Sequence, residues 1–273
     1  MMVSTTPPSG TPPGGSLGTV ASTRHTRLLF AVLGVAAILV GWQLLSLVVN
    51  PAIMASPADT ARALASLAWK GTLWIQLLTT LKRLVIGLAI GAAVGLVLGV
   101  LAGLEPRLRS FLEPLRWTGM TVPAVIIAVL AMLWFGLGDV SVIFLVAAIV
   151  IPVMYVNTVA GVLAIDPRLG EMGNVYRFSR RLLLTEIYLP GIGLPVMAGL
   201  TLATGIAVRA VVLGEVLGAM DGIGHAFSRA MSYLETPELF AWVVVLLALM
   251  GVLELGLLRP LKRRAMRWRK VSE

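Results

Sequence analysis

The chain has 273 residues, of which 58% are hydrophobic and only 13% are charged, and its mean hydropathy is +0.93. A water-soluble domain of this length carries more surface charge, whereas repeated apolar runs of about 18 residues or more indicate transmembrane helices. The net charge of +9 gathers in a few loops and in the tail Arg259 to Lys270. That pattern orients membrane helices and attracts anionic lipid, so we expect a membrane protein that does not bind nucleic acid.

The N-terminal stretch 4–23 is rich in Pro, Gly, Ser and Thr and lacks the apolar core of a signal peptide. We expect residues 1–27 to form a disordered cytoplasmic tail. Arg24 and Arg27 precede the first apolar run, Leu28 to Val49. Because cytoplasmic flanks of membrane helices are enriched in Arg and Lys, this first span is predicted to run outward.

A short helix is predicted between the first two spans, over Ser56 to Lys70. Ser56 followed by Pro57 and then Asp59 is typical of a helix start, with proline at the first helical position. The stretch is too polar and too short to cross a bilayer. We therefore expect it to lie on the outer membrane surface.

The second span, Leu78 to Leu104, carries a glycine at every fourth position. Because residues four apart share one face of a helix, the five glycines form a stripe of small residues. Such stripes allow membrane helices to approach closely. We expect this stripe to pack against another helix of the same chain rather than against a second copy. The stripe consists of Gly87, Gly91, Gly95, Gly99 and Gly103.

Four more apolar segments complete an all-α prediction of six transmembrane helices: Trp117 to Phe135, which contains Pro123, Val140 to Ala164, Gly191 to Gly218, and Leu239 to Leu258. A short charged loop, Glu105 to Arg116, is predicted before the third span. With both termini in the cytoplasm, most of the 22 basic residues fall on the inner side. The permease domain is placed at 28–260, followed by a basic cytoplasmic tail, 261–273.

A polar, basic island interrupts the apolar runs between the fourth and fifth spans. It reads EMGNVYRFSRRLLLTEIYLP from Glu171 to Pro190, within a loop at 165–190. Its arginines predict a cytoplasmic position. The apolar edge formed by its leucines and Ile187 predicts a short amphipathic helix.

This island resembles the "EAA" loop of the membrane subunits of ABC importers. Glu171, Ile187, Leu189 and Pro190 match the loop's pattern of E-A-A, three residues, G, nine residues and I-x-L-P. The chain departs from it at Met172 and Gly173, where the family has alanines, and at Arg177, where it has glycine. The resemblance implies that 165–190 is a coupling helix that docks into a groove on a cytoplasmic ATPase. We expect Glu171 to be a contact or cap there, and we hypothesise that Gly173 supplies the flexibility of the glycine replaced by Arg177.

The resemblance extends over most of the chain, toward the branch of these importers that carries nitrate, sulfonates and taurine. The motifs that carry it include Pro57, Leu81-Lys82-Arg83, Pro123-Ala124, Leu133 to Gly138, Asn157-Thr158, Leu194-Pro195, Gly214-Glu215 and Gly222-Ile223-Gly224. It implies two permease copies in the bacterial inner membrane, two ATPases inside and a solute-binding protein outside. ATP and Mg²⁺ would belong to the ATPases, because no lysine of this chain lies in a phosphate-binding Walker A sequence.

Arg209 lies deep in the fifth span, where a charge is costly and normally faces a cavity or a partner. One interpretation is an arginine that lines the translocation pathway of a small anion; the other is a structural ion pair or a shallower position. Glu215 is a second pathway candidate. Six residues separate the two, so they do not share a helix face as i, i+4 neighbours do.

Two other classes of protein, a secondary transporter and a membrane enzyme, would require different residues. A stand-alone secondary transporter needs coupling carboxylates near the middle of the bilayer, and the spans offer no convincing candidate. A membrane enzyme would need a cluster of His, Asp or Glu, but His225 stands alone in an external loop and reads as a surface group rather than a metal ligand. No catalytic residue, metal or resident cofactor is therefore predicted.

Overall fold

The structure, a computed structural model, describes residues 24–50 and 52–258, and within these ranges it consists of helices, turns and short connections, without a strand. The predictions for the two tails, 1–27 and 261–273, fall outside the described residues except at Arg24 to Arg27, which begin α1. In chain order the elements are α1 (Arg24–Val48), α2 (Pro57–Trp69), α3 (Thr72–Leu104), α4 (Pro106–Thr121), α5 (Ala124–Phe135), α6 (Asp139–Leu163), α7 (Pro167–Val175), α8 (Arg180–Leu183), a π-helical turn η1 (Leu184–Tyr188), α9 (Leu189–Gly191), α10 (Gly193–Gly218), α11 (Ile223–Ser232), α12 (Thr236–Val252) and a second π-helical turn η2 (Leu253–Leu258).

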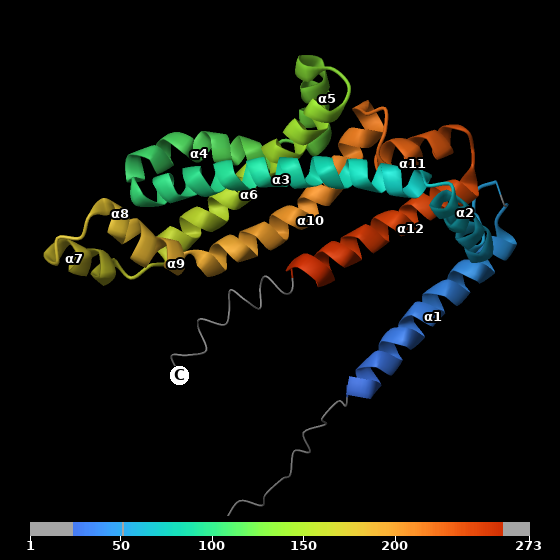
Figure 1. Ribbon diagram of the computed structural model, residues 1–273, viewed down its shortest axis with the longest axis horizontal. Coiled ribbons are helices and arrows are strands. Elements are labelled where there is room, and N and C mark those ends of the chain that lie inside the picture. Colours follow the sequence, from blue (N-terminus) through green and yellow to red (C-terminus); the bar gives the residue numbers. More distant parts are fainter. Residues whose placement is uncertain (1–23, 51, 259–273) are drawn as a thin grey trace, which may run out of the picture.

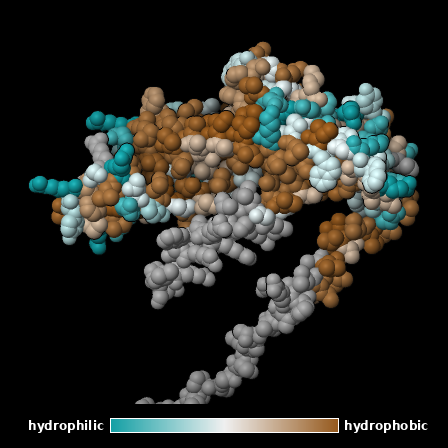
Figure 2. Space-filling view, in the orientation of Figure 1, coloured by the Kyte–Doolittle hydropathy of each residue, from teal (hydrophilic) through white to brown (hydrophobic). Residues whose placement is uncertain are grey.

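Three of these helices, α3, α6 and α10, are long and apolar enough to cross a membrane. Two shorter apolar helices, Val32–Val48 within α1 and α12, accompany them, and α4 with α5 forms a broken apolar pair. The apolar surface makes a broad band, with hydrophilic surface gathered toward α7 and α8 at one end and toward α2 and α11 at the other (Figure 2). The predicted fold class, a polytopic all-helical membrane protein, is what the described chain shows.

The third span differs from the prediction. Residues predicted as a charged loop form α4, which begins at Pro106 and is capped by the Glu105 side chain accepting from the Arg107 amide at 3.3 Å. The helix then stops at Val122, and α5 leaves at 102° (Figure 1). Pro123 explains the break, because proline forces the preceding residue out of the α conformation, and Val122 is extended with φ −66° and ψ 125°.

The short helix predicted after the first span is α2, and its start is the expected one. The Ser56 hydroxyl accepts from the Asp59 amide at 3.1 Å, and Pro57 occupies the first helical position. Such a cap satisfies one of the amides that a helix leaves unpaired at its first turn. It is amphipathic, with Thr60 and Leu67 buried.

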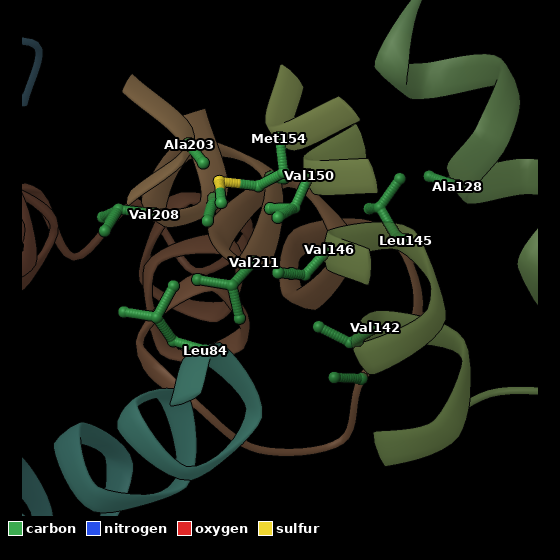
Figure 3. Packing of buried hydrophobic residues seen from close by; sticks show 13 residues of the cluster. Leu84, Ala128, Val142, Leu145, Val146, Val150, Met154, Ala203, Val208 and Val211 are labelled. Carbon is green, nitrogen blue, oxygen red and sulfur yellow. The ribbon is translucent and has the colours of Figure 1, made fainter. Parts of the chain in front are cut away.

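The core lies where α6 packs between α3 and α10. Leu84 of α3, Val146 and Val150 of α6 and Val211 of α10 converge there (Figure 3). The glycine stripe of α3 faces α6: a Cβ built on Gly95 would lie 2.6 Å from the carbonyl oxygen of Ile151. The other four glycines of the stripe would likewise meet α6 side chains. This is packing inside the chain, the arrangement that the sequence analysis favoured.

Replacing Gly95 with alanine is expected to destabilise the protein by about 1–3 kcal/mol, the usual effect of overpacking. The added methyl meets a backbone oxygen that moves only if the helices separate. Gly205→Ala is the control, because a Cβ there meets nothing within 4 Å. Thermal unfolding in detergent should show a lower midpoint for Gly95→Ala alone; equal midpoints for the two variants would contradict the packing account.

Candidate functional site

The segment predicted to couple to an ATPase projects as a small helical unit at the end of the molecule opposite α2 and α11 (Figure 1). Glu171 and Gly173 lie in α7, and the Glu171 side chain is exposed. Apolar side chains are exposed beside it, with Val175 and Tyr176 at 79% and 70%. An exposed surface of this mixed character suits contact with another protein.

Arg177 has a backbone φ of 54°, in the left-handed region. That region suits glycine, because a side chain there clashes with the backbone. It is also the position at which the resemblance predicts glycine. Gly173 lies within α7, and whether it supplies flexibility stays a prediction.

From Arg180 the chain is helical through α8, η1 and α9 to Gly191. This agrees with the amphipathic helix predicted over the leucines of the island. Ile187 is half-buried, whereas Leu189 and Pro190 are exposed. The segment therefore offers a helical surface, not a slack loop.

The two ends of the projecting segment pack together beside the core. A Cβ on Gly191, at its end, would lie 3.0 Å from the side chain of Ile165, at its start. Just outside the segment, a Cβ on Gly161 of α6 would lie 2.8 Å from the Pro195 side chain of α10. The segment therefore starts and ends where α6 and α10 are in close contact.

Arg209 lines a cavity of about 380 Å³ beneath the break between α4 and α5. Val122 and Ala124 at the break, Pro152 of α6 and Leu213 of α10 also line it, and Arg209 is the one charged residue among its lining residues. The Arg209 side chain is exposed. A charge in an otherwise apolar cavity is placed to meet a polar group that enters it.

Glu215 lies elsewhere, in a fully enclosed site between α3, α10 and the start of α11. Its carboxylate accepts from the Thr80 hydroxyl at 2.9 Å, from Arg83 at 2.9 Å and from the Gly224 amide at 2.9 Å. Its exposed fraction is 0%. The carboxylate therefore faces this buried network and not the cavity that Arg209 lines, and the two residues do not pair.

Arg83 is the hub of the network. Its guanidinium donates to Asp139 of α6 at 2.7 and 2.5 Å, to Glu215 of α10, and to both the carbonyl and the carboxylate of Asp221. The planar guanidinium has five N–H donors, which suits several acceptors at once. Three helices, α3, α6 and α10, and the turn before α11 are thus held together by one side chain.

The glycines of the turn let its backbone reach the network. Gly222 has φ 97°, and a Cβ there would overlap the Glu215 carboxylate. Its amide donates to the Gln76 side chain, and the next amide, of Ile223, donates to Thr80 at 2.8 Å. The motif Gly222-Ile223-Gly224 is therefore explained by close backbone approach.

From the sequence alone, Arg83 was given no structural role and was named only within the motif Leu81-Lys82-Arg83. The structure buries Arg83 to 1% exposure. One signal was present: Arg83 and Glu215 are opposite charges in two spans, both near the outer end. A matched pair of that kind in apolar helices favours a contact.

Replacing Arg83 with leucine is expected to destabilise the protein by about 3–5 kcal/mol, because it leaves the buried Glu215 carboxylate without its counter-charge. Lys82→Leu is the matched control: Lys82 is the neighbouring residue, is exposed and binds only Asp139, at 3.0 Å. Unfolding midpoints and folded yield in detergent measure the difference. Comparable losses in both variants would refute the hub role of Arg83.

Within the described ranges, no three His, Asp or Glu side chains gather as a metal site requires, and the chain has no cysteine. The features that stand out are a cavity with one charge, a buried network and a projecting helical segment.

Comparison with known proteins places this architecture in a family. Residues 95–265 match the family described as binding-protein-dependent transport system inner membrane component. The chain is 30% identical over 240 residues to the aliphatic sulfonates transport permease protein SsuC of Bacillus subtilis, covering 87% of each chain. It is 34% identical over 245 residues to the SsuC of Escherichia coli, covering 88% of this chain and 90% of that one.

The taurine transport system permease protein TauC of Escherichia coli is also similar, at 28% identity over 251 residues, 89% of this chain and 91% of that one. The chain therefore belongs to the family of binding-protein-dependent transport permeases, a class of membrane transport proteins and not of enzymes.

Solved structures of ABC importers share the fold. A chain of the MetNI methionine ABC transporter superposes with a TM-score of 0.55 at 18% identity, covering 71% of this chain and 94% of that one. A chain of an amino acid ABC transporter gives a TM-score of 0.52 at 16% identity, covering 74% and 97%. At such identities the likeness concerns the arrangement of helices.

Proposed function

We propose that two copies of this chain form the translocation pathway of an ATP-driven importer for a small anion of the sulfonate, nitrate or carboxylate class. Membership in the permease family supports the transport role. The sulfonate and taurine permeases among its relatives are named for anionic or zwitterionic sulfonates, which supports this solute class.

The observation that carries the solute class is Arg209 in its cavity. The cavity lies beneath a break in the apolar pair α4–α5, and its lining is apolar apart from this guanidinium. A fixed positive charge in a surrounding of low polarity attracts an anion more strongly than it would in water. The planar fork of arginine also matches the paired oxygens of a sulfonate or carboxylate.

Coupling to the energy source is assigned to the projecting segment at 165–190. A helix lying in a groove is a common mode of protein recognition, and the exposed Glu171, Leu189 and Pro190 provide charged and apolar contacts for one. Because the segment is joined tightly to α6 and α10, closure of two ATPases would move the helices that line the Arg209 cavity. ATP and Mg²⁺ are bound by those partner subunits.

We infer the orientation from charge. The arginines of the coupling segment and of α4 support a cytoplasmic location for that end of the molecule, the side on which the sequence predicts both termini. α2, α11 and the turn before α11 then face outward, where a solute-binding protein delivers its ligand. Alternating exposure of the cavity to the two sides would complete the cycle.

Arg209→Ala is expected to lower ATP-dependent uptake at least about tenfold, because the anion loses its counter-charge. Arg209→Lys keeps the charge without the planar fork and should retain part of the rate. Arg62→Ala, at an exposed arginine paired only with Asp59, is the control. The assay is uptake of radiolabelled sulfonate into proteoliposomes that hold the full transporter. Unchanged uptake by Arg209→Ala would leave this residue no role in the pathway.

Glu171→Arg is expected to abolish ATP-dependent uptake and to weaken retention of the ATPase during purification, since the charge at the docking surface is reversed. Glu254→Arg reverses another exposed carboxylate, outside the coupling segment, and should retain both properties. Co-purified ATPase per permease, measured alongside uptake, separates the two variants. Full coupling in Glu171→Arg would show that this residue does not contact the ATPase, and uptake without any ATPase would favour a secondary transporter.

A further inference from the structure

A second cavity, of about 440 Å³, lies between α3, α4 and α6. It is elongated: its lining residues on α6 extend from Phe144 to Tyr155, about 16 Å at the helical rise of about 1.5 Å per residue. Ile90 and Leu98 of α3 form part of the opposite wall. Its volume falls in the range of about 300–1,000 Å³ that is usual for small-ligand sites.

One end of this cavity is polar. Tyr155 is only 5% exposed, and its hydroxyl is buried with no hydrogen-bond partner among the described residues. A buried hydroxyl without a partner is costly, so such groups usually meet a ligand or a water. Tyr155 is among the residues that line the cavity, so a ligand there brings its acceptors close to this hydroxyl.

The same end is basic. Arg116 of α4 lines the cavity, and its guanidinium pairs with Glu113. Arg107 and Arg109 lie further along the same helix, toward its beginning. Three arginines against Glu113 give this helix a surplus of positive charge at the predicted cytoplasmic side of the bilayer, where anionic lipid headgroups gather.

We propose that this cavity binds one acyl chain of an anionic glycerophospholipid from the cytoplasmic leaflet. The chain lies along the apolar slot between α3 and α6, and its ester carbonyl accepts a hydrogen bond from the Tyr155 hydroxyl. The phosphate lies against the arginines of α4. The site is separate from the Arg209 cavity in its ligand, although Gly119 and Pro152 lie in the walls of both.

Shape and charge together select this ligand. A compact hydrophilic anion would fill little of an elongated slot whose walls are almost wholly apolar, and it would lose its hydration without compensation. An acyl chain would cover the apolar wall of the cavity. The ester linkage would then meet the Tyr155 hydroxyl, and the phosphate would meet the arginines of α4, at the same end. A phospholipid has these three parts in the required order.

The test uses the full transporter purified in mild detergent, stripped of lipid and then exposed to vesicles of phosphatidylglycerol or of phosphatidylcholine. Native mass spectrometry counts lipid retained per permease chain. Ala148→Trp, which fills the slot, should lose the bound lipid. Val97→Trp is the matched control, because Val97 is next to Leu98 on α3 but is exposed on another face. The expected result is one retained phosphatidylglycerol per chain in wild type and in Val97→Trp.

Tyr155→Phe keeps the shape of the slot and removes only the hydroxyl. It is expected to reduce lipid retention by about 3- to 10-fold, the effect of losing one hydrogen bond of about 0.7–1.4 kcal/mol. Equal retention of phosphatidylglycerol and phosphatidylcholine would overturn the headgroup assignment. Equal retention by Ala148→Trp and Val97→Trp would overturn the site itself.

The remaining occupant to exclude is a second copy of the chain. Because the chain has no cysteine, Ala148→Cys introduces a unique thiol in the slot. It should react with a membrane-soluble maleimide only after the lipid is stripped. A thiol that stays blocked after stripping, or one that forms a disulfide between two copies, would show that protein fills the slot and would overturn the proposal.

Discussion

The close contact between α3 and α6 is the constraint on which the rest of the structure depends. In a bilayer, apolar helices gain little from leaving lipid for one another, so their association rests on packing. The glycine stripe of α3 allows α6 to approach until a methyl at Gly95 would overlap the backbone of Ile151. α10 then packs on α6 from the other side, and both helices lead directly into the coupling segment.

Arg83 and Arg209 both lie in apolar helices, but their surroundings differ. Arg83 is enclosed and donates to three carboxylates, so its charge is fully used in holding helix ends together. Arg209 is exposed in a cavity whose other lining residues carry no charge. The first joins α3, α6 and α10 to one another, and the second is the residue that we propose meets the transported anion.

The sequence predicted correctly those local structures that depend only on neighbouring residues. The cap at Ser56, the glycine spacing of α3 and the helical island before Pro190 all follow from short-range rules. The break at Val122 was harder, because proline within a membrane helix is often tolerated and only the surrounding helices decide. The Arg83 network was missed since its partners lie 56, 132 and 138 positions away; no local pattern shows which of several charges will meet.

The left-handed turn at Arg177 belongs to the same class of difficulty. Arg177 has a positive φ, which an arginine in the sequence does not signal. The sequence could therefore place the helical segment but not this turn. The exposure of Glu171 on the projecting unit, and the contact between Gly191 and Ile165 that brings the ends of the segment together, required the three-dimensional structure.

The most direct test of the account is the mass of the intact assembly, extracted from its own membranes in mild detergent through a tag on this chain. We predict two copies of this chain together with two copies of an ATP-hydrolysing subunit, and release of that subunit when the coupling segment is altered. A preparation that holds this chain without any ATPase, yet still transports solute after reconstitution, would contradict the account and indicate a carrier that works alone.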